Sequence, residues 1–134
     1  MSDASKEAQD LFDRYLDCWN RRDLEGVVTC YDEPTTFVLP SGAVTLPNRQ
    51  VLLAFFEEMI SELEKSGFSH TTLGPVSAVS CGNGLAVVDV SNVQRFKKDG
   101  SLLEKIDSHY VMRNCEGTWR LTVALPCANG WRSA

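Results

Sequence analysis

The chain has 134 residues and a formal net charge of −5, and 43% of its residues are hydrophobic. This length suits one domain spanning 1–134, and the composition is typical of a folded protein, which excludes disorder as the expected state. Nucleic acid and anionic membranes require clustered Lys and Arg, whereas the only basic pairs here are Arg21-Arg22 and Lys97-Lys98, so neither partner is expected.

The sequence also argues against a membrane anchor, a disulfide framework and a metal site. No stretch approaches the roughly 20 apolar residues of a membrane span, and the N-terminal "MSDASKEAQD" is polar, so a cytoplasmic location is expected. His70 and His109 are the only histidines and form no HxxxH or HExxH motif, so no metal and no cofactor are expected. The cysteines are odd in number and none have CxxC spacing, which predicts free thiols at Cys18, Cys30, Cys81, Cys115 and Cys127.

The first third of the chain predicts two consecutive helices. Apolar side chains recur at steps of three and four residues in the first helix, at Leu11, Phe12, Tyr15, Leu16 and Trp19. We expect Asn20 to end this helix in a left-handed conformation. Asp23 then caps a second, short helix that extends to Tyr31, and Pro34 prevents its continuation.

Two short strands and a third helix are expected next. The segments "TTFVLP" and "AVTLP" predict paired strands on either side of the turn at Pro40-Ser41-Gly42. Asn48 is the expected cap of the third helix, and Gly67 is its expected end. The buried stripe of this helix is predicted at Leu52, Phe55, Phe56, Met59, Ile60 and Leu63.

From Phe68 onward the pattern changes to β structure. Turn signals lie at Gly82-Asn83-Gly84, Asp99-Gly100 and Glu116-Gly117, at intervals of about 16 residues, which predicts four long antiparallel strands. Helices followed by strands favour an α+β fold, in which three N-terminal helices cover one face of a curved, mainly antiparallel sheet.

The Asp99-Gly100 turn predicts which side chains share a face, because a two-residue hairpin loop sets the register. The predicted cross-strand pairs are Arg95 with Glu104, Val93 with Ile106, Ser91 with Ser108, Asp89 with Tyr110, and Val87 with Met112. The Glu116-Gly117 turn adds another strand to this mostly apolar face, with Trp119, Leu121, Val123 and Leu125. The opposite face is polar and includes His109. A single β-bulge would reverse part of this assignment.

A polar patch on the apolar face is the most informative feature of this map. It consists of Asp89, Ser91, Ser108 and Tyr110. A carboxylate in a dry core carries a large free-energy cost. Asp89 is therefore a structural acid hydrogen-bonded to Tyr110 and its neighbours, or a bulge turns it outward, or it lines a cavity. In the last case it can orient a ligand or act as a general acid or base.

The order of these motifs resembles the nuclear transport factor two-like superfamily, also called SnoaL-like. The resemblance covers nearly the whole chain and rests on "WNRRDLEGVVTCY", on the short strand ending in Leu-Pro-Ser-Gly, and on "VQRFKKDGSLLEKIDSHYVMR" leading into "GTWRL". It implies a cone-shaped, cystatin-like roll with a pocket between the helices and the sheet. It does not fix a function, because the superfamily includes isomerases, cyclases, dehydratases and transport factors.

Ketosteroid isomerases of this superfamily allow a comparison of individual residues. Tyr15 stands where their first helix carries the tyrosine that hydrogen-bonds the developing oxyanion. Their general base is an aspartate directly before a proline, and the matching position here is Leu39, before Pro40. Leucine cannot accept a proton, so the resemblance does not extend to the steroid-isomerase mechanism.

The sequence therefore favours a protein that binds a small molecule, mainly apolar with a polar group, without catalysis. The predicted ligand-binding residues are Tyr15, Trp19, Phe37, Phe55, Met59, Asp89, Ser91, Ser108 and Tyr110. The alternative is a lyase- or isomerase-type enzyme in which Asp89 is the general acid or base and Tyr15 or Tyr110 donates a hydrogen bond. A second alternative is a protein-interaction module that uses the polar sheet face and Trp131. Pairing through that face would also give the homodimer common in the superfamily.

Overall fold

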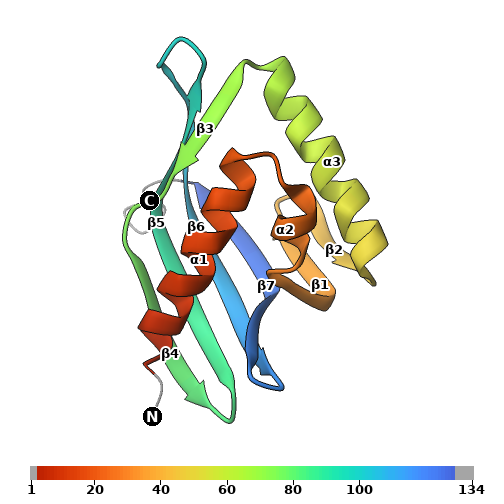
Figure 1. Cartoon of the computed structure of the whole chain (residues 1–134), viewed down its shortest axis with the longest axis vertical. Helices are drawn as coiled ribbons and strands as arrows, with labels where there is room; N and C mark the ends of the chain where they lie inside the picture. Colours follow the sequence, from red (N-terminus) through yellow and green to blue (C-terminus); the bar gives the residue numbers. More distant parts are fainter. Residues whose placement is uncertain (1–2, 129–134) are drawn as a thin grey trace.

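The computed structural model describes residues 3–128, and within them three helices lie on one face of a seven-stranded sheet (Figure 1). The helices are α1 (Ala4–Asn20), α2 (Leu24–Val28) and α3 (Arg49–Lys65). The strands are β1 (Tyr31–Leu39), β2 (Gly42–Leu46), β3 (Phe68–Thr72), β4 (Val76–Gly82), β5 (Leu85–Lys97), β6 (Leu102–Cys115) and β7 (Thr118–Ala128). The expected α+β architecture is confirmed.

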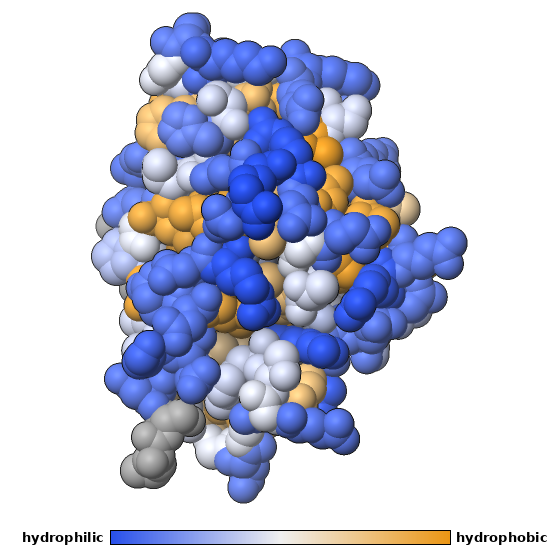
Figure 2. Space-filling model, in the orientation of Figure 1, coloured by the Kyte–Doolittle hydropathy of each residue, from blue (hydrophilic) through white to orange (hydrophobic). Residues whose placement is uncertain are grey.

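The sheet is mainly antiparallel. Its strands run in the order β2-β1-β7-β6-β5-β3, and β4 also pairs with β5. The pairing of β1 with β7 is parallel, whereas the other described pairings are antiparallel. Most of the surface on the helix-bearing side is hydrophilic (Figure 2). The apolar stripes of the helices therefore point toward the sheet.

Polar caps explain where the helices begin. The side chains of Asp3, Asp23 and Asn48 accept hydrogen bonds from backbone N–H groups at the starts of α1, α2 and α3. The caps predicted at Asp23 and Asn48 are confirmed. The stripe that α1 buries against the core consists of Ala8, Leu11, Phe12, Cys18 and Trp19.

Both ends of α1 are hydrogen-bonded to the edge of the sheet. Near its start, the Ser5 hydroxyl donates to the Ala78 carbonyl (3.1 Å) and accepts from the Ala78 N–H (3.0 Å). At its end, the Asn20 side chain makes the same double contact with the backbone of Thr71, at 3.0 and 2.9 Å. These bonds satisfy backbone groups at the edges of β4 and β3, and they hold α1 across the sheet.

The second helix is shorter than predicted and does not reach Tyr31. Tyr31 is the first residue of β1, and α2 ends before it. The Leu121 N–H of β7 donates to the Cys30 carbonyl at 2.8 Å, so strand pairing begins as soon as the helix has ended. The left-handed residue before α2 is Arg22 (φ 62°), not Asn20 as predicted.

The segment after Phe68 that was expected to form one long strand is divided into β3 and β4. The chain turns at Gly74, whose N–H donates to the Ser91 carbonyl at 2.9 Å. A Cβ at this position would lie 2.3 Å from that oxygen, so no side chain fits there. Five strands, not four, therefore follow α3. The turns predicted at Gly82-Asn83-Gly84 and Glu116-Gly117 are confirmed, and at Glu116 and Gly117 both φ angles are positive (54° and 92°), as a tight hairpin requires. The loop at Asp99-Gly100 also includes Lys98, so it has three residues and not the predicted two, because the Lys97 N–H donates to the Ser101 carbonyl at 2.8 Å.

A β-bulge in β5 changes the predicted register. The pairs of Arg95 with Glu104 and Val93 with Ile106 are confirmed. Beyond them the register shifts, and the observed pairs are Val90 with Ser108, Asp89 with His109, Val88 with Tyr110, and Val87 with Val111. The predicted pairs of Ser91 with Ser108, Asp89 with Tyr110, and Val87 with Met112 are wrong. Asn92 accommodates the extra residue in a left-handed conformation (φ 51°), which asparagine tolerates.

In β5, the side chains between Leu85 and the bulge lie on the opposite face of the sheet from the one predicted. Val88 and Val90 are buried, at 0% and 1% exposure. Because side chains alternate along a strand, the intervening Asp89 points to the outer face of the sheet, away from the helices. The prediction that Asp89 and Ser91 lie on the helix-facing side is therefore wrong.

A register shift in β7, the last strand, also reverses the predicted faces of some of its side chains. It lies opposite the Val111-Met112 segment of β6. Ala124 is buried beneath the helices, whereas Val123 and Leu125 line a groove on the outer face, contrary to the prediction. Leu121, on the other side of the shift, is fully buried as predicted.

Candidate functional site

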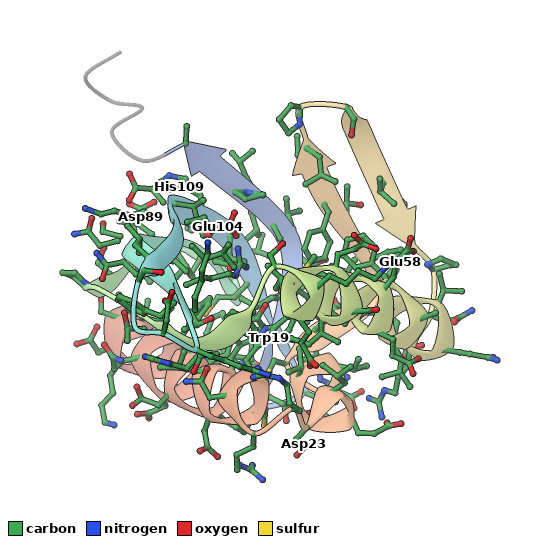
Figure 3. The ribbon with its side chains drawn as sticks, turned by 90° about the horizontal axis from the view of Figure 1, so that it is seen from above. Trp19, Asp23, Glu58, Asp89, Glu104 and His109 are labelled. Atoms are coloured by element: carbon green, nitrogen blue, oxygen red, sulfur yellow. The ribbon has the colours of Figure 1, made fainter. Side chains whose placement is uncertain are left out.

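A cavity of about 220 Å³ lies between the helices and the inner face of the sheet. Its apolar wall includes Trp19, Phe37, Leu39, Phe56, Met59 and Ile106. Its polar lining residues are Tyr15, Tyr31, Arg95, Glu104, Ser108 and Tyr110. Figure 3 shows Trp19 between α1 and α3, with Glu104 on the sheet side. The cavity is thus enclosed by elements that are far apart in the sequence.

A second, smaller chamber of about 40 Å³ is lined partly by the same residues. It extends toward β3 and includes Phe12, Thr71 and Leu73 in its wall. Both spaces are lined by Tyr15, Trp19, Arg95, Ile106, Ser108 and Tyr110. These shared residues therefore form the boundary between the two spaces, and a ligand in either space would meet them.

Packed aromatic rings form the apolar wall. Phe56 meets Trp19 edge-on, with ring centroids 5.5 Å apart, and Tyr31 stacks on Phe37 at 5.7 Å. Phe55 packs on Phe37 at 4.9 Å but is not among the lining residues. Aromatic pairs favour defined relative orientations, and these contacts therefore stabilise the arrangement of the wall.

Two tyrosine hydroxyls meet in the cavity. The Tyr15 and Tyr31 oxygens lie 2.8 Å apart. Burial raises the pKa of Tyr15 and of Tyr31 well above the usual value, so both phenols are neutral near pH 7. Hydrogen bonds with Tyr31 and Trp19 lower the pKa of Tyr15, but by less than burial raises it. When Tyr31 donates to the Tyr15 oxygen, Tyr15 retains its own O–H for a ligand.

Tyr110, the third tyrosine of the chain, belongs to the same site. Burial raises its pKa, and a hydrogen bond with Ser108 and the positive charge of Arg95 have smaller, opposite effects. The Ser108 residue is itself only 4% exposed. We refer to Tyr15, Arg95, Ser108 and Tyr110 as the polar cluster, because they bring hydrogen-bonding groups into a cavity that is otherwise mostly apolar.

An ion pair supplies the only formal charges among the described residues that line the cavity. Arg95 Nη1 contacts Glu104 Oε1 between the neighbouring strands β5 and β6. The Arg95 side chain is 20% exposed and the Glu104 side chain 41% exposed. The guanidinium is therefore the more deeply placed member of the pair, and the carboxylate is the one that meets solvent.

Several of the predicted ligand-binding residues line this cavity, namely Tyr15, Trp19, Phe37, Met59, Ser108 and Tyr110. Their role in binding a ligand stays a prediction. Phe55 is replaced in the lining by its neighbour Phe56, because successive residues of a helix point in different directions.

Asp89 and Ser91, in contrast, are not among the residues that line the cavity. Asp89 Oδ1 lies 2.6 Å from Nδ1 of His109, and the Asp89 side chain is 40% exposed. Figure 3 shows these two residues beside each other on the side of the sheet away from α1. The predicted position of His109 on the outer face is confirmed, and the geometric basis for an acid–base role of Asp89 in the cavity is removed.

Three residues that line the cavity were not predicted as site residues: Tyr31, Arg95 and Glu104. Tyr31 was assigned to a helix, which hid its position at the start of β1. A signal for the other two was present, because the predicted register already placed this charged pair on the apolar face. Leu39 also lines the cavity. The position where the resemblance places a catalytic aspartate thus lies inside the site and carries no proton acceptor.

Neither a group of potential metal ligands nor a membrane-spanning helix occurs among the described residues. Within residues 3–128, no three or more His, Cys, Asp or Glu side chains are grouped as metal ligands. Over the same range, no helix has both the length and the apolar character needed to cross a membrane. The five cysteines are all free thiols.

The chain is similar to known proteins over most of its length. Residues 6–129 match the sequence model of a family described as "NTF2-like protein (DUF6841)", where NTF2 denotes nuclear transport factor two. No curated protein matches the chain significantly.

Solved structures with similar folds have low sequence identity to this chain. An NTF2-like protein with a cystatin-like fold from Novosphingobium aromaticivorans has a TM-score of 0.75 and 16% identity, covering 93% of this chain and 82% of that one. A domain of unknown function with a cystatin-like fold from Nostoc punctiforme has a TM-score of 0.74 and 18% identity, covering 99% and 83%. An NTF2-like protein of unknown function from Pseudomonas putida has a TM-score of 0.74 and 14% identity, covering 92% and 85%. These similarities confirm the cystatin-like fold.

Proposed function

The chain belongs to the family of NTF2-like proteins, and within it we propose that the protein binds a small molecule, mainly apolar with one polar end, in the cavity between helices and sheet. The observation that carries this proposal is a preformed cavity of about 220 Å³ with an aromatic wall and one polar cluster. Binding sites for small molecules are typically apolar with a few convergent polar groups. The family alone would not support this function, because one fold can serve many functions.

The size and lining of the cavity favour occupation by a ligand. An engineered apolar cavity of about 150 Å³ in another protein binds benzene, so a cavity of about 220 Å³ accommodates a somewhat larger molecule. The Tyr15 hydroxyl and the buried Ser108 hydroxyl give such a molecule hydrogen-bonding partners beside the apolar wall. A ligand that is apolar throughout would leave these groups unused.

Binding without catalysis is favoured over a lyase or isomerase. Asp89, the acid–base group of the enzyme hypothesis, lies on the outer face of the sheet. Leu39 occupies the place of the isomerase base and cannot accept a proton. Among the described residues that line the cavity, Glu104 is the only carboxylate, and it is paired with Arg95. We therefore do not assign a reaction to this site.

Substituting a larger side chain into the cavity wall tests this proposal. Ala124→Leu adds three carbon atoms at a buried lining position, whereas Ala43→Leu makes the same change at an exposed position of β2. We expect small aromatic fragments, detected by ligand-observed NMR, to bind the wild type and the Ala43→Leu variant but not Ala124→Leu. Circular dichroism and thermal unfolding check that each variant is folded. Fragment binding that survives Ala124→Leu unchanged would contradict the proposal.

We further propose a homodimer formed through the outer face of the sheet. Support comes from a groove of about 140 Å³ on this face, whose lining includes Val87, His109, Val111, Val123 and Leu125. Val87 and Leu125 are 44% and 38% exposed, and contiguous exposed apolar side chains are typical of interaction sites. A two-fold pairing would bury the same patch on both copies.

Sedimentation velocity tests the dimer directly. Val87→Lys places a charge in the groove and is expected to give a monomer, whereas Val44→Lys on β2, away from the groove, is expected to leave the dimer intact. A wild type that sediments as a monomer would contradict the proposed homodimer. Trp131, which the protein-interaction alternative included, lies outside the described residues.

We also propose a cytoplasmic location. Its support is the five free thiols, which suit a reducing compartment.

A further inference from the structure

The charged pair in the cavity wall indicates the chemical class of the ligand. We propose that the ligand is a small monocarboxylic acid, about the size of one aromatic ring with a short side chain, and that Arg95 binds its carboxylate in place of Glu104. The inference rests on the proposed function, because it requires the cavity to be the binding site.

Arg95 is placed to meet a ligand in either space. It lines both the cavity and the smaller chamber. Its positive charge acts on the buried hydroxyl of Tyr110 and lowers the pKa of that group against the larger effect of burial. The guanidinium therefore acts on the interior of the cavity as well as on the surface.

Glu104 leaves much of the hydrogen-bonding capacity of Arg95 unused. A guanidinium has five N–H donors, and the contact with Glu104 involves only Nη1. Glu104 is also the only ion-pair partner that Arg95 has among the described residues. A ligand carboxylate can form a bidentate pair with the guanidinium, which is a stronger arrangement than a single contact.

The rest of the polar cluster suits an anion better than a cation or a neutral group. The Tyr15 and Tyr110 phenols are protonated near pH 7, since even an exposed tyrosine has a pKa of about 10 and burial raises the pKa of each, so they can donate hydrogen bonds. A carboxylate only accepts, with about four lone-pair sites. An ammonium group would instead meet the positive charge of Arg95, with the single lining carboxylate already engaged.

The exposure of Glu104 makes the exchange of partners possible. Its side chain is 41% exposed, against 20% for Arg95, so Glu104 can turn into water at a small free-energy cost. A ligand carboxylate that enters from the cavity then takes its place on the guanidinium. In the absence of ligand, Glu104 therefore acts as an internal competitor for the binding site.

The cavity volume limits the ligand to a small acid. Since about 150 Å³ suffices for benzene, the space of about 220 Å³ accommodates one ring and a short substituent but not a fused polycyclic molecule. Phenylacetate has this size and charge. Phenylacetamide and 2-phenylethylamine keep the ring and spacer while replacing the anion by a neutral and a cationic group.

Isothermal titration calorimetry with these three probes tests the inference. We expect phenylacetate to bind at least about 10-fold more tightly than either analogue, because hydrogen bonds to charged groups are the stronger ones. Arg95→Gln should weaken phenylacetate binding roughly 10- to 100-fold. Glu104→Gln should strengthen it about 2- to 5-fold by removing the competitor. This opposite change cannot result from misfolding.

A matched control removes the same charge at a distant ion pair. Arg21→Gln disrupts the contact of Arg21 with Asp17 on the exposed surface and should leave the affinity for phenylacetate unchanged. If phenylacetamide binds as tightly as phenylacetate and Arg95→Gln has no effect, the inference is wrong but the cavity remains a binding site. If neither the three probes nor small neutral fragments bind the wild type, both the inference and the proposed function are wrong.

Discussion

Strands β5 and β6 hold one acid–base pair on each face of the sheet. Arg95 and Glu104 line the cavity on the inner face, whereas His109 and Asp89 meet beside an aliphatic groove on the outer face. In sequence the two pairs look alike, since each joins an acid and a base on opposite strands of one hairpin. The bulge at Asn92 separates them, and this one extra residue decides which acid a ligand in the cavity can reach.

The largest expected difference between the two faces concerns packing. Val88 is 0% exposed on the inner face, and its neighbour Val87 is 44% exposed on the outer face. We expect Val88→Ala to lower the free energy of unfolding by about 2–3 kcal/mol, through lost burial and a small cavity, and Val87→Ala by less than about 1 kcal/mol. Urea unfolding measures both. These values apply at protein concentrations low enough to keep the copies separate, because the proposed dimer would cover Val87. Equal losses under that condition would contradict the difference in packing between the two faces.

The inner face also contains all three tyrosines, and alkaline pH should reveal this. Burial raises the pKa of Tyr15, Tyr31 and Tyr110 in the folded state, so the stabilisation is complete below the unfolded-state pKa of about 10. Above that pH the unfolded chain loses protons that the folded one keeps. Each tyrosine then lowers the free energy of unfolding by about 1.4 kcal/mol per pH unit until its folded-state pKa is reached.

Ultraviolet absorbance of the phenolate measures this effect. In the folded protein we expect no phenolate signal as the pH rises past the usual tyrosine pKa, followed by a cooperative increase that coincides with loss of the circular dichroism signal. Gradual titration of a tyrosine while the fold persists would show that at least one of these hydroxyls is open to solvent, and the inner face would then be less closed than the cavity geometry indicates.

The bulge itself is expected to have a smaller effect. Asn92 has a φ of 51°, a conformation that costs most residues with a Cβ about 1–2 kcal/mol. Asn92→Ala should therefore lower the free energy of unfolding by about 1 kcal/mol, and Asn92→Gly should be close to neutral because glycine adopts this conformation readily. Chemical denaturation compares the two variants. An equal loss in both would mean that the asparagine side chain, and not the backbone conformation, stabilises the bulge.

The parts of the fold that depend on local signals could be predicted from the sequence. The caps at Asp23 and Asn48 and the turn at Glu116-Gly117 depend on neighbouring residues, and they are confirmed. Tyr31 was misassigned because its strand conformation depends on pairing with β7, which is distant in the sequence. The break at Gly74 depends in the same way on its contact with Ser91.

The site was predictable only as far as the register was. Between the hairpin loop and the bulge, the predicted pairs of Arg95 with Glu104 and Val93 with Ile106 are confirmed, and the first of them contains both charged residues of the cavity. A register shift between Arg95 and Phe96 compensates for the extra loop residue. Beyond the bulge, alternation assigned Asp89 to the wrong face. Asn92 gave no signal of its own, because an asparagine inside an alternating strand is equally compatible with an ordinary exposed position. The resemblance was more informative at Leu39, which does line the cavity.

Asp89→Asn is expected to have the smallest effect, and it tests the comparison of the two faces most directly. The substitution keeps the size of the side chain and removes its charge beside His109, at a position that is 40% exposed. We expect the free energy of unfolding to fall by less than about 1 kcal/mol and the affinity for phenylacetate to stay within about twofold of wild type, in contrast to Arg95→Gln. Calorimetry on both variants decides the matter. A loss of affinity in Asp89→Asn as large as that in Arg95→Gln would mean that the outer acid acts on the ligand, and the assignment of ligand recognition to the inner face would fail.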